Sequence, residues 1–157
     1  MFINSALIIL LFSVVIFFLS KEYKKAENSY QKYLLIGMFL MHFSMCIFHW
    51  TWVNEQQIDV HYFYNTALNT DNWFDVFGIG SKFIAFVIYP LVKIGVSYLG
   101  LFVLFSSISM IGYVNLYKLL YQGIEDNLYK LIFSILLLLP SIHFWTSSFG
   151  KEALIFP

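Results

Sequence analysis

The sequence contains no arginine, and charged residues of all kinds make up only 11% of its 157 residues. Nine lysines balance nine acidic residues, so the net charge is zero. Because no basic surface is available to displace counterions from a phosphate backbone, we do not expect the chain to bind nucleic acid. The single cysteine, Cys46, excludes an intrachain disulfide bond.

Apolar residues dominate the composition: 60% of the chain is hydrophobic and 21% is aromatic. Soluble domains carry about one-quarter charged residues. The apolar residues also fall in long runs, close to the roughly 20 residues that a helix needs to cross hydrocarbon, and they do not alternate as in a strand. The sequence therefore predicts an all-α, polytopic integral membrane protein.

Four spans are predicted within a single membrane domain that covers residues 1–157. They lie at about 2–19, 34–52, 97–117 and 131–145, and a further span is expected to start at 151. The first run lacks the positive segment and cleavage site of a signal peptide, so we expect it to be retained. Because a new apolar run begins at Ala153, we expect the chain to be the N-terminal part of a longer protein.

The loops predict an orientation. Four lysines, Lys21, Lys24, Lys25 and Lys32, lie between the first two spans, whereas residues 53–81 carry four acidic residues and no lysine. By the positive-inside rule the first loop is cytoplasmic and the second is extracytoplasmic. The third and fourth spans then return the chain to the outer side near residue 151.

The segment 82–95 is too short to span the membrane, and Pro90 interrupts the hydrogen bonding of its backbone. At 3.6 residues per turn, Lys82, Tyr89 and Lys93 share one stripe, and apolar residues that include Phe83 and Ile94 lie opposite. This pattern predicts an interfacial helix in the outer loop, with its lysines directed to lipid headgroups. The alternative is one short half of a tilted hairpin.

The first polar cluster follows the second span. If residues 59–68 are helical, Asp59, Tyr62, Phe63 and Thr66 lie on one face. A carboxylate held beside apolar rings is suited to act as a general base. The alternative is that Asp59 is simply a solvated acid that caps a loop helix.

The second polar cluster closes the fourth span, where Lys151 and Glu152 are expected at the outer boundary. Ionisable residues at such depth are costly unless they are paired or functional. A lysine beside a glutamate could hold a phosphate or a metal-bound diphosphate. The alternative is an interfacial anchor pair, with Trp145 in the aromatic belt.

A third group, His42, Cys46 and His49, shares one face of the second span. Two imidazoles and a thiol are metal or haem ligands in other proteins. Packing between helices explains polar residues in a span at least as well. No second histidine pair is evident on another span, so we predict no metal site.

Two segments carry a family resemblance: Asp59-Val60-His61-Tyr62-Phe63-Tyr64-Asn65-Thr66-Ala67 and Leu139-Pro140-Ser141-Ile142-His143-Phe144-Trp145-Thr146-Ser147-Ser148-Phe149-Gly150-Lys151-Glu152-Ala153. With the interfacial helix between them, they resemble bacterial polytopic glycosyltransferases of the GT-C class and related surface-polysaccharide polymerases. The resemblance implies transfer of a sugar from a polyprenyl-phosphate-linked donor to a glycan acceptor on the outer face of the bacterial cytoplasmic membrane.

The same resemblance implies roles for individual residues. Asp59 would act as the base or orient the acceptor, with Tyr62 beside it in substrate binding. Lys151 and Glu152 would hold the carrier phosphate or a divalent metal ion, and no other cofactor is expected. Lys82 and Lys93 would meet headgroup phosphate. The alternative is a non-enzymatic membrane scaffold or transporter fragment whose aromatic outer loop binds lipid or a partner.

Overall fold

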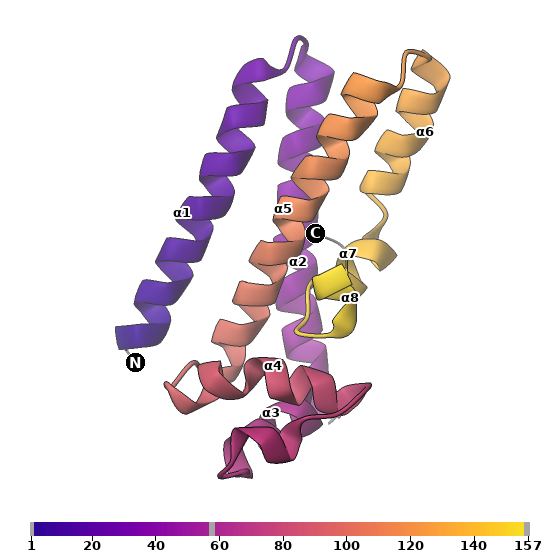
Figure 1. The fold of residues 1–157 in the computed structure, drawn as a ribbon. Helices are drawn as coiled ribbons and strands as arrows, with labels where there is room; N and C mark the ends of the chain where they lie inside the picture. The colour runs from indigo at the N-terminus through magenta and orange to yellow at the C-terminus, as the bar shows by residue number, and fades with distance from the viewer. Residues whose placement is uncertain (1, 57–58, 156–157) are drawn as a thin grey trace.

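A computed structural model describes residues 2–56 and 59–155 of the chain, and all regular structure in these residues is helical. Three long helices run side by side, and shorter helices gather at one end and along one flank of the bundle (Figure 1). The elements, in order, are α1 (Phe2–Lys25), α2 (Ser29–Gln56), α3 (Asp59–Asn69), the 3-10 helix η1 (Trp73–Val76), α4 (Ser81–Lys93), α5 (Tyr98–Gly123), α6 (Asn127–Leu137), α7 (Pro140–Thr146) and α8 (Lys151–Ile155).

Helices α1, α2 and α5 are each long and apolar enough to cross a membrane. They coincide with the first three predicted spans, although α1 and α2 continue into the polar residues of the loops. Large apolar side chains are exposed on their outer faces, such as Ile9 (67%) and Ile47 (63%). Such exposure would be costly in water and is expected in lipid. The architecture is therefore consistent with the all-α membrane protein that the composition predicts.

The fourth predicted span is broken. Helices α6 and α7 meet at an angle of 51°, and together they qualify as one bent span or a re-entrant loop. Pro140 explains the break, because it lacks an N–H group and disfavours helical backbone at the residue before it. Leu139 accordingly has an extended conformation, with φ −65° and ψ 121°. The span predicted at 131–145 therefore consists of two helices that meet at a bend.

Helices α3 and α4 lie across one end of the bundle (Figure 1) and pack against each other. The inner face of α4 is formed by Ile84, Ala85, Ile88 and Val92, all of which are buried. This packing explains the large apolar content of a helix that is too short to span.

The predicted polar stripe of this helix needs correction. Tyr89 is only 8% exposed, and its hydroxyl donates a hydrogen bond of 2.6 Å to the carbonyl of Asp71. Lys93 Nζ lies 3.0 Å from the carbonyl oxygen of Leu68, to which it donates, and only Lys82 and Lys93 of the stripe are exposed. The helical wheel placed Tyr89 on the same stripe as the two lysines, but the connection through η1 covers its side chain.

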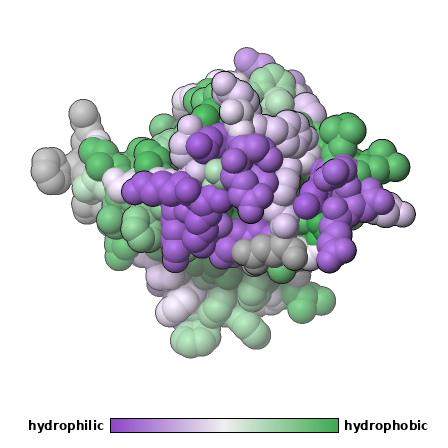
Figure 2. Space-filling view, turned by 90° about the horizontal axis from the view of Figure 1, so that it is seen from above, coloured by the Kyte–Doolittle hydropathy of each residue, from purple (hydrophilic) through white to green (hydrophobic). Residues whose placement is uncertain are grey.

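The opposite end of the molecule is polar. It contains the α1–α2 and α5–α6 connections, and Figure 2, which views this end, shows hydrophilic residues gathered at its centre. The buried Glu22 carboxylate lies 3.2 Å from Lys25 Nζ and 3.9 Å from Lys118 Nζ. The lysine-rich loop and the acidic segment after α2 therefore lie at opposite ends of the bundle, as the predicted topology requires.

Candidate functional site

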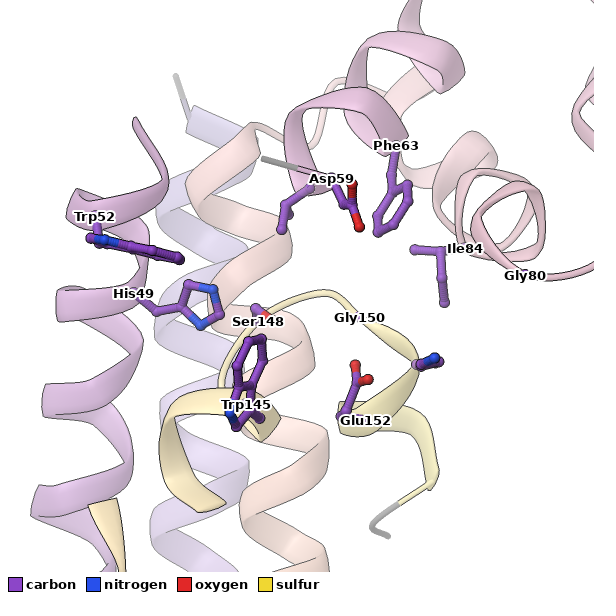
Figure 3. A pocket seen from close by; sticks show the side chains of 12 residues that line it. His49, Trp52, Asp59, Phe63, Gly80, Ile84, Trp145, Ser148, Gly150 and Glu152 are labelled. Carbon is purple, nitrogen blue, oxygen red and sulfur yellow. The ribbon is translucent and has the colours of Figure 1, made fainter. Parts of the chain in front are cut away.

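A cavity of about 480 Å³ lies between the end of α2, the α3–α4 cap and the segment that joins α7 to α8 (Figure 3). Aromatic and apolar side chains form much of its wall, and charged groups enter it from two elements. Its lining residues are His49, Trp52, Asp59, Val60, Phe63, Gly80, Ile84, Trp145, Ser148, Gly150, Lys151 and Glu152. The two polar clusters singled out in the sequence therefore share one cavity, although they are 92 residues apart.

The acidic groups of the cavity are Asp59 and Glu152, whose carboxylates point into it from opposite sides in Figure 3. Asp59 lies in the first turn of α3, where the helix dipole favours negative charge. Its side chain is exposed, so it is not withdrawn from water as the sequence pattern suggested. Glu152 is partly buried and lies next to the exposed Lys151. The cavity thus combines two hydrogen-bond acceptors of negative charge with one cation.

Gly150 makes room for the Glu152 carboxylate. A Cβ atom added at Gly150 would lie 2.8 Å from Oε2 of Glu152 and 3.7 Å from the Ser148 hydroxyl. The chain turns tightly here, since the Gly150 N–H donates a hydrogen bond of 2.9 Å to the carbonyl of Ser148. The glycine lets the carboxylate fold back over the backbone and face the cavity.

His49 fixes one wall of the cavity. Its ring is stacked on Phe144, with centroids 4.1 Å apart and an angle of 6° between the planes. His49 Nδ1 lies 2.8 Å from the carbonyl oxygen of Phe144, which accepts only, so Nδ1 carries the hydrogen. In the neutral ring, Nε2 is then an acceptor. The sequence pattern predicted either a metal ligand or a packing contact for His49, and neither interpretation placed it in the wall of a cavity.

Trp52 and Trp145 add large aromatic surfaces to the wall, and Phe63 adds a third. Trp145 is 56% exposed, although it is large and apolar. Aromatic faces of this kind pack against apolar faces of ligands, including the C–H faces of sugar rings. The sequence did not distinguish these residues from an aromatic belt, because belt and binding surfaces have the same composition.

The other predicted site residues lie elsewhere. Tyr62 is 54% exposed and does not line the cavity, because Phe63 and Val60 form the inward face of α3. Lys82 and Lys93 are also exposed outside it. Asp59, Lys151 and Glu152 are therefore the predicted residues that the structure brings together.

The face of α2 that carries His42, Cys46 and His49 does not form one cluster. His42 contacts His143 of α7, whereas His49 contacts Phe144 and lines the cavity. Within the described part of the chain, no group of three or more His, Cys, Asp or Glu side chains could hold a metal ion. His143 lay in the quoted segment after Pro140, but nothing in its sequence context predicted a partner on α2.

A search for related proteins finds no matching protein family, curated protein or solved structure.

Proposed function

We propose that this chain forms the outer-face site of a membrane glycosyltransferase, which transfers a sugar from a polyprenyl-phosphate-linked donor during surface polysaccharide or glycan assembly. One observation carries the proposal. Two carboxylates and a lysine, Asp59, Glu152 and Lys151, line a single cavity whose remaining wall is largely aromatic. Transfer of a sugar from a phosphate carrier needs a base, a cation near the leaving phosphate and a surface for the sugar.

The proposed orientation follows from charge. The end that contains the α1–α2 connection carries Lys21, Lys24, Lys25 and Lys32 and would face the cytoplasm. The cavity would then open toward the outer leaflet of the bacterial cytoplasmic membrane. Helices α1, α2 and α5 and the broken pair α6–α7 would make four crossings, and α4 would lie at the outer interface. Lys82 and Lys93, exposed on α4, would be close to lipid headgroups.

The proposed chemistry assigns one role each to Asp59 and Lys151. Asp59 takes the proton from an acceptor hydroxyl, and that oxygen forms a bond to the anomeric carbon of the donor sugar. The bond from the anomeric carbon to the phosphate oxygen breaks, and the electron pair leaves with the polyprenyl phosphate. Lys151 stabilises the departing negative charge. Trp145 and Trp52 would hold the sugar by stacking.

The carboxylates also fit a divalent cation in part. Mg²⁺ is often held by one or two carboxylates together with phosphate oxygens of the substrate. Asp59 and Glu152 provide two such groups in one cavity. An ion at this position would neutralise the carrier phosphate, and it would depend on that phosphate for further ligands.

The experiment is substitution of Asp59 by Asn in the chromosomal gene. Membranes from these cells are supplied with polyprenyl-phosphate-linked sugar, and the initial rate of transfer is measured. General base catalysis contributes about 100-fold or more, so we expect the rate to fall by that order. Asp71→Asn is the matched control, since Asp71 is an exposed acid of the same segment outside the cavity lining.

Protein abundance in the membrane is measured for both variants. An unchanged transfer rate in Asp59→Asn would reject the base, and absence of any transfer by the wild-type membranes would favour a scaffold or transporter that binds lipid or a partner.

A further inference from the structure

A second polar site is buried between the helices, away from the cavity. His42 of α2 and His143 of α7 are both 0% exposed, and their Nδ1 atoms lie 3.0 Å apart. This distance is that of a hydrogen bond between two ring nitrogens. One of the two atoms must carry a hydrogen for the contact to be favourable.

The other ring nitrogens face carbonyl oxygens. His143 Nε2 lies 2.7 Å from the carbonyl oxygen of Leu137, and His42 Nε2 lies 3.0 Å from that of Ser106. A carbonyl oxygen accepts only, so both Nε2 atoms are assigned as donors. Together with the hydrogen between the Nδ1 atoms, the pair needs three N–H hydrogens. Two neutral imidazoles carry only two.

Ser109 offers one way to avoid the third hydrogen, by donating its hydroxyl hydrogen to His42 Nε2, but this arrangement leaves two carbonyl contacts without a hydrogen. Its hydroxyl lies 3.0 Å from His42 Nε2 and 2.8 Å from the carbonyl oxygen of Thr146. If the hydroxyl hydrogen pointed at Nε2, Thr146 would lose that donor and the Ser106 carbonyl would face a lone pair. With a third hydrogen on the histidines, His42 Nε2 donates to the Ser106 carbonyl and the Ser109 hydroxyl donates to the Thr146 carbonyl. Only the 3.1 Å approach of the Ser109 hydroxyl to the Ser106 carbonyl then lacks a hydrogen of its own.

The surroundings of the pair favour positive charge. The Leu137 carbonyl belongs to the last residue of α6, and the Thr146 carbonyl belongs to the last residue of α7. Helix C-termini carry partial negative charge, and the ends of broken membrane helices bind cations in this way. Tyr113 of α5 stacks on His143 with centroids 4.4 Å apart, and its ring face attracts a cation.

Few other titratable groups face the pair. Tyr113 comes from α5, where its hydroxyl is 3.0 Å from Thr146 Oγ1. From α2, Cys46 lies one turn beyond His42, and His49 follows one turn later against Phe144. Residues 2–20, 33–54, 94–117 and 131–150 contain no Asp, Glu, Lys or Arg, so no acidic side chain of these segments neutralises the pair.

We propose that His42 and His143 form a proton-binding site in the middle of the bundle, which holds one additional proton between the two Nδ1 atoms. The two imidazoles together take up one proton from water. The break between α6 and α7 directs the Leu137 carbonyl at His143, and the Ser106 carbonyl of α5 faces His42. The proposal does not depend on the activity of the cavity.

The test is nuclear magnetic resonance of the whole chain in lipid nanodiscs, with ¹⁵N-labelled histidine. The chain has four histidines, and His61→Gln and His49→Gln identify the signals outside the pair. Spectra are recorded from about pH 8 to about pH 5, the range in which histidine changes its charge. We expect uptake of one proton by the pair and a scalar coupling between the two Nδ1 nuclei. His42→Asn and His143→Asn should each abolish both signals.

Three results would overturn the site: no uptake, uptake of two protons, or one proton without coupling between the nitrogens. The wild-type spectra decide among them even where an asparagine variant fails to fold. His61→Gln is the control, since His61 of α3 contacts the Val53 carbonyl, and it should leave the uptake unchanged.

Discussion

The Glu152 carboxylate occupies the space over Gly150 that a side chain there would need, since an added Cβ would lie 2.8 Å from Oε2. That distance is shorter than a van der Waals contact. A side chain at residue 150 and the present position of the Glu152 carboxylate therefore exclude each other. The atom that would have to move is the end of a flexible side chain, so the structure can yield at low cost.

The first prediction concerns Gly150→Ala. The methyl group should turn the Glu152 carboxylate out of its present position and lower the rate of sugar transfer, while the free energy of unfolding changes by less than about 1 kcal/mol. Both quantities are measured on purified protein in lipid. Gly123→Ala is the control, because a Cβ at Gly123 meets nothing within 4 Å. Equal transfer rates in the two variants would show that the position of Glu152 is unimportant.

The second prediction separates the two contacts of His49. The change His49→Phe keeps an aromatic ring for the stack on Phe144 but removes the Nδ1 donor to the Phe144 carbonyl. The net value of such a hydrogen bond is about 0.5–1.5 kcal/mol, and we expect the protein to lose that amount of stability. Unfolding in detergent by heat or denaturant measures it. Phe48→Leu, on the exposed face of α2, should have a smaller effect, and the reverse order would contradict the assigned donor.

The third prediction concerns the end cap. Tyr89→Phe removes the hydroxyl that donates to the Asp71 carbonyl and leaves the buried ring in place. We expect a loss of about 1 kcal/mol. The more direct measurement is hydrogen exchange, which should rise in η1 and at the start of α4 and remain unchanged in α5. Uniform exchange across all helices would show that the hydroxyl does not hold the cap in place.

The fourth prediction tests the orientation. Cys46 is 2% exposed, so the native chain should react little with a thiol reagent that cannot cross membranes. Asp71→Cys adds a thiol at the cavity end, and Ser29→Cys adds one at the lysine-rich end. On intact spheroplasts we expect Asp71→Cys to be labelled and Ser29→Cys to be labelled only after permeabilisation. The opposite pattern would place the cavity in the cytoplasm and reject an outer-face donor.

Much of the bundle could be predicted from the sequence, because α1, α2 and α5 are long uninterrupted apolar runs and lipid accepts such helices. The break in the fourth span was harder. Pro140 was visible, but the position of the bend depends on Leu139 adopting an extended conformation and on His143 reaching the Leu137 carbonyl. Those are tertiary contacts, and no pattern of one segment contains them.

The site was predictable to a similar degree. The charge of the loops placed Asp59, Lys151 and Glu152 on one side, and the structure brings them into one cavity. The cavity position of His49 was missed because residues within an apolar run are expected to face lipid or other helices. Tyr89 was misplaced because a helical wheel gives the angle of a residue and not what covers it.

The short stretch from Phe144 to Ser148 borders both sites. Trp145 and Ser148 line the cavity, whereas the carbonyls of Thr146 and Ser147 accept hydrogen bonds from Ser109 and Ser106 beside the histidine pair. Any ligand that displaces this stretch therefore also changes the surroundings of the bound proton. Thermodynamic linkage makes such an effect reciprocal, so the factor by which acidity changes ligand affinity equals the factor by which the ligand changes proton affinity.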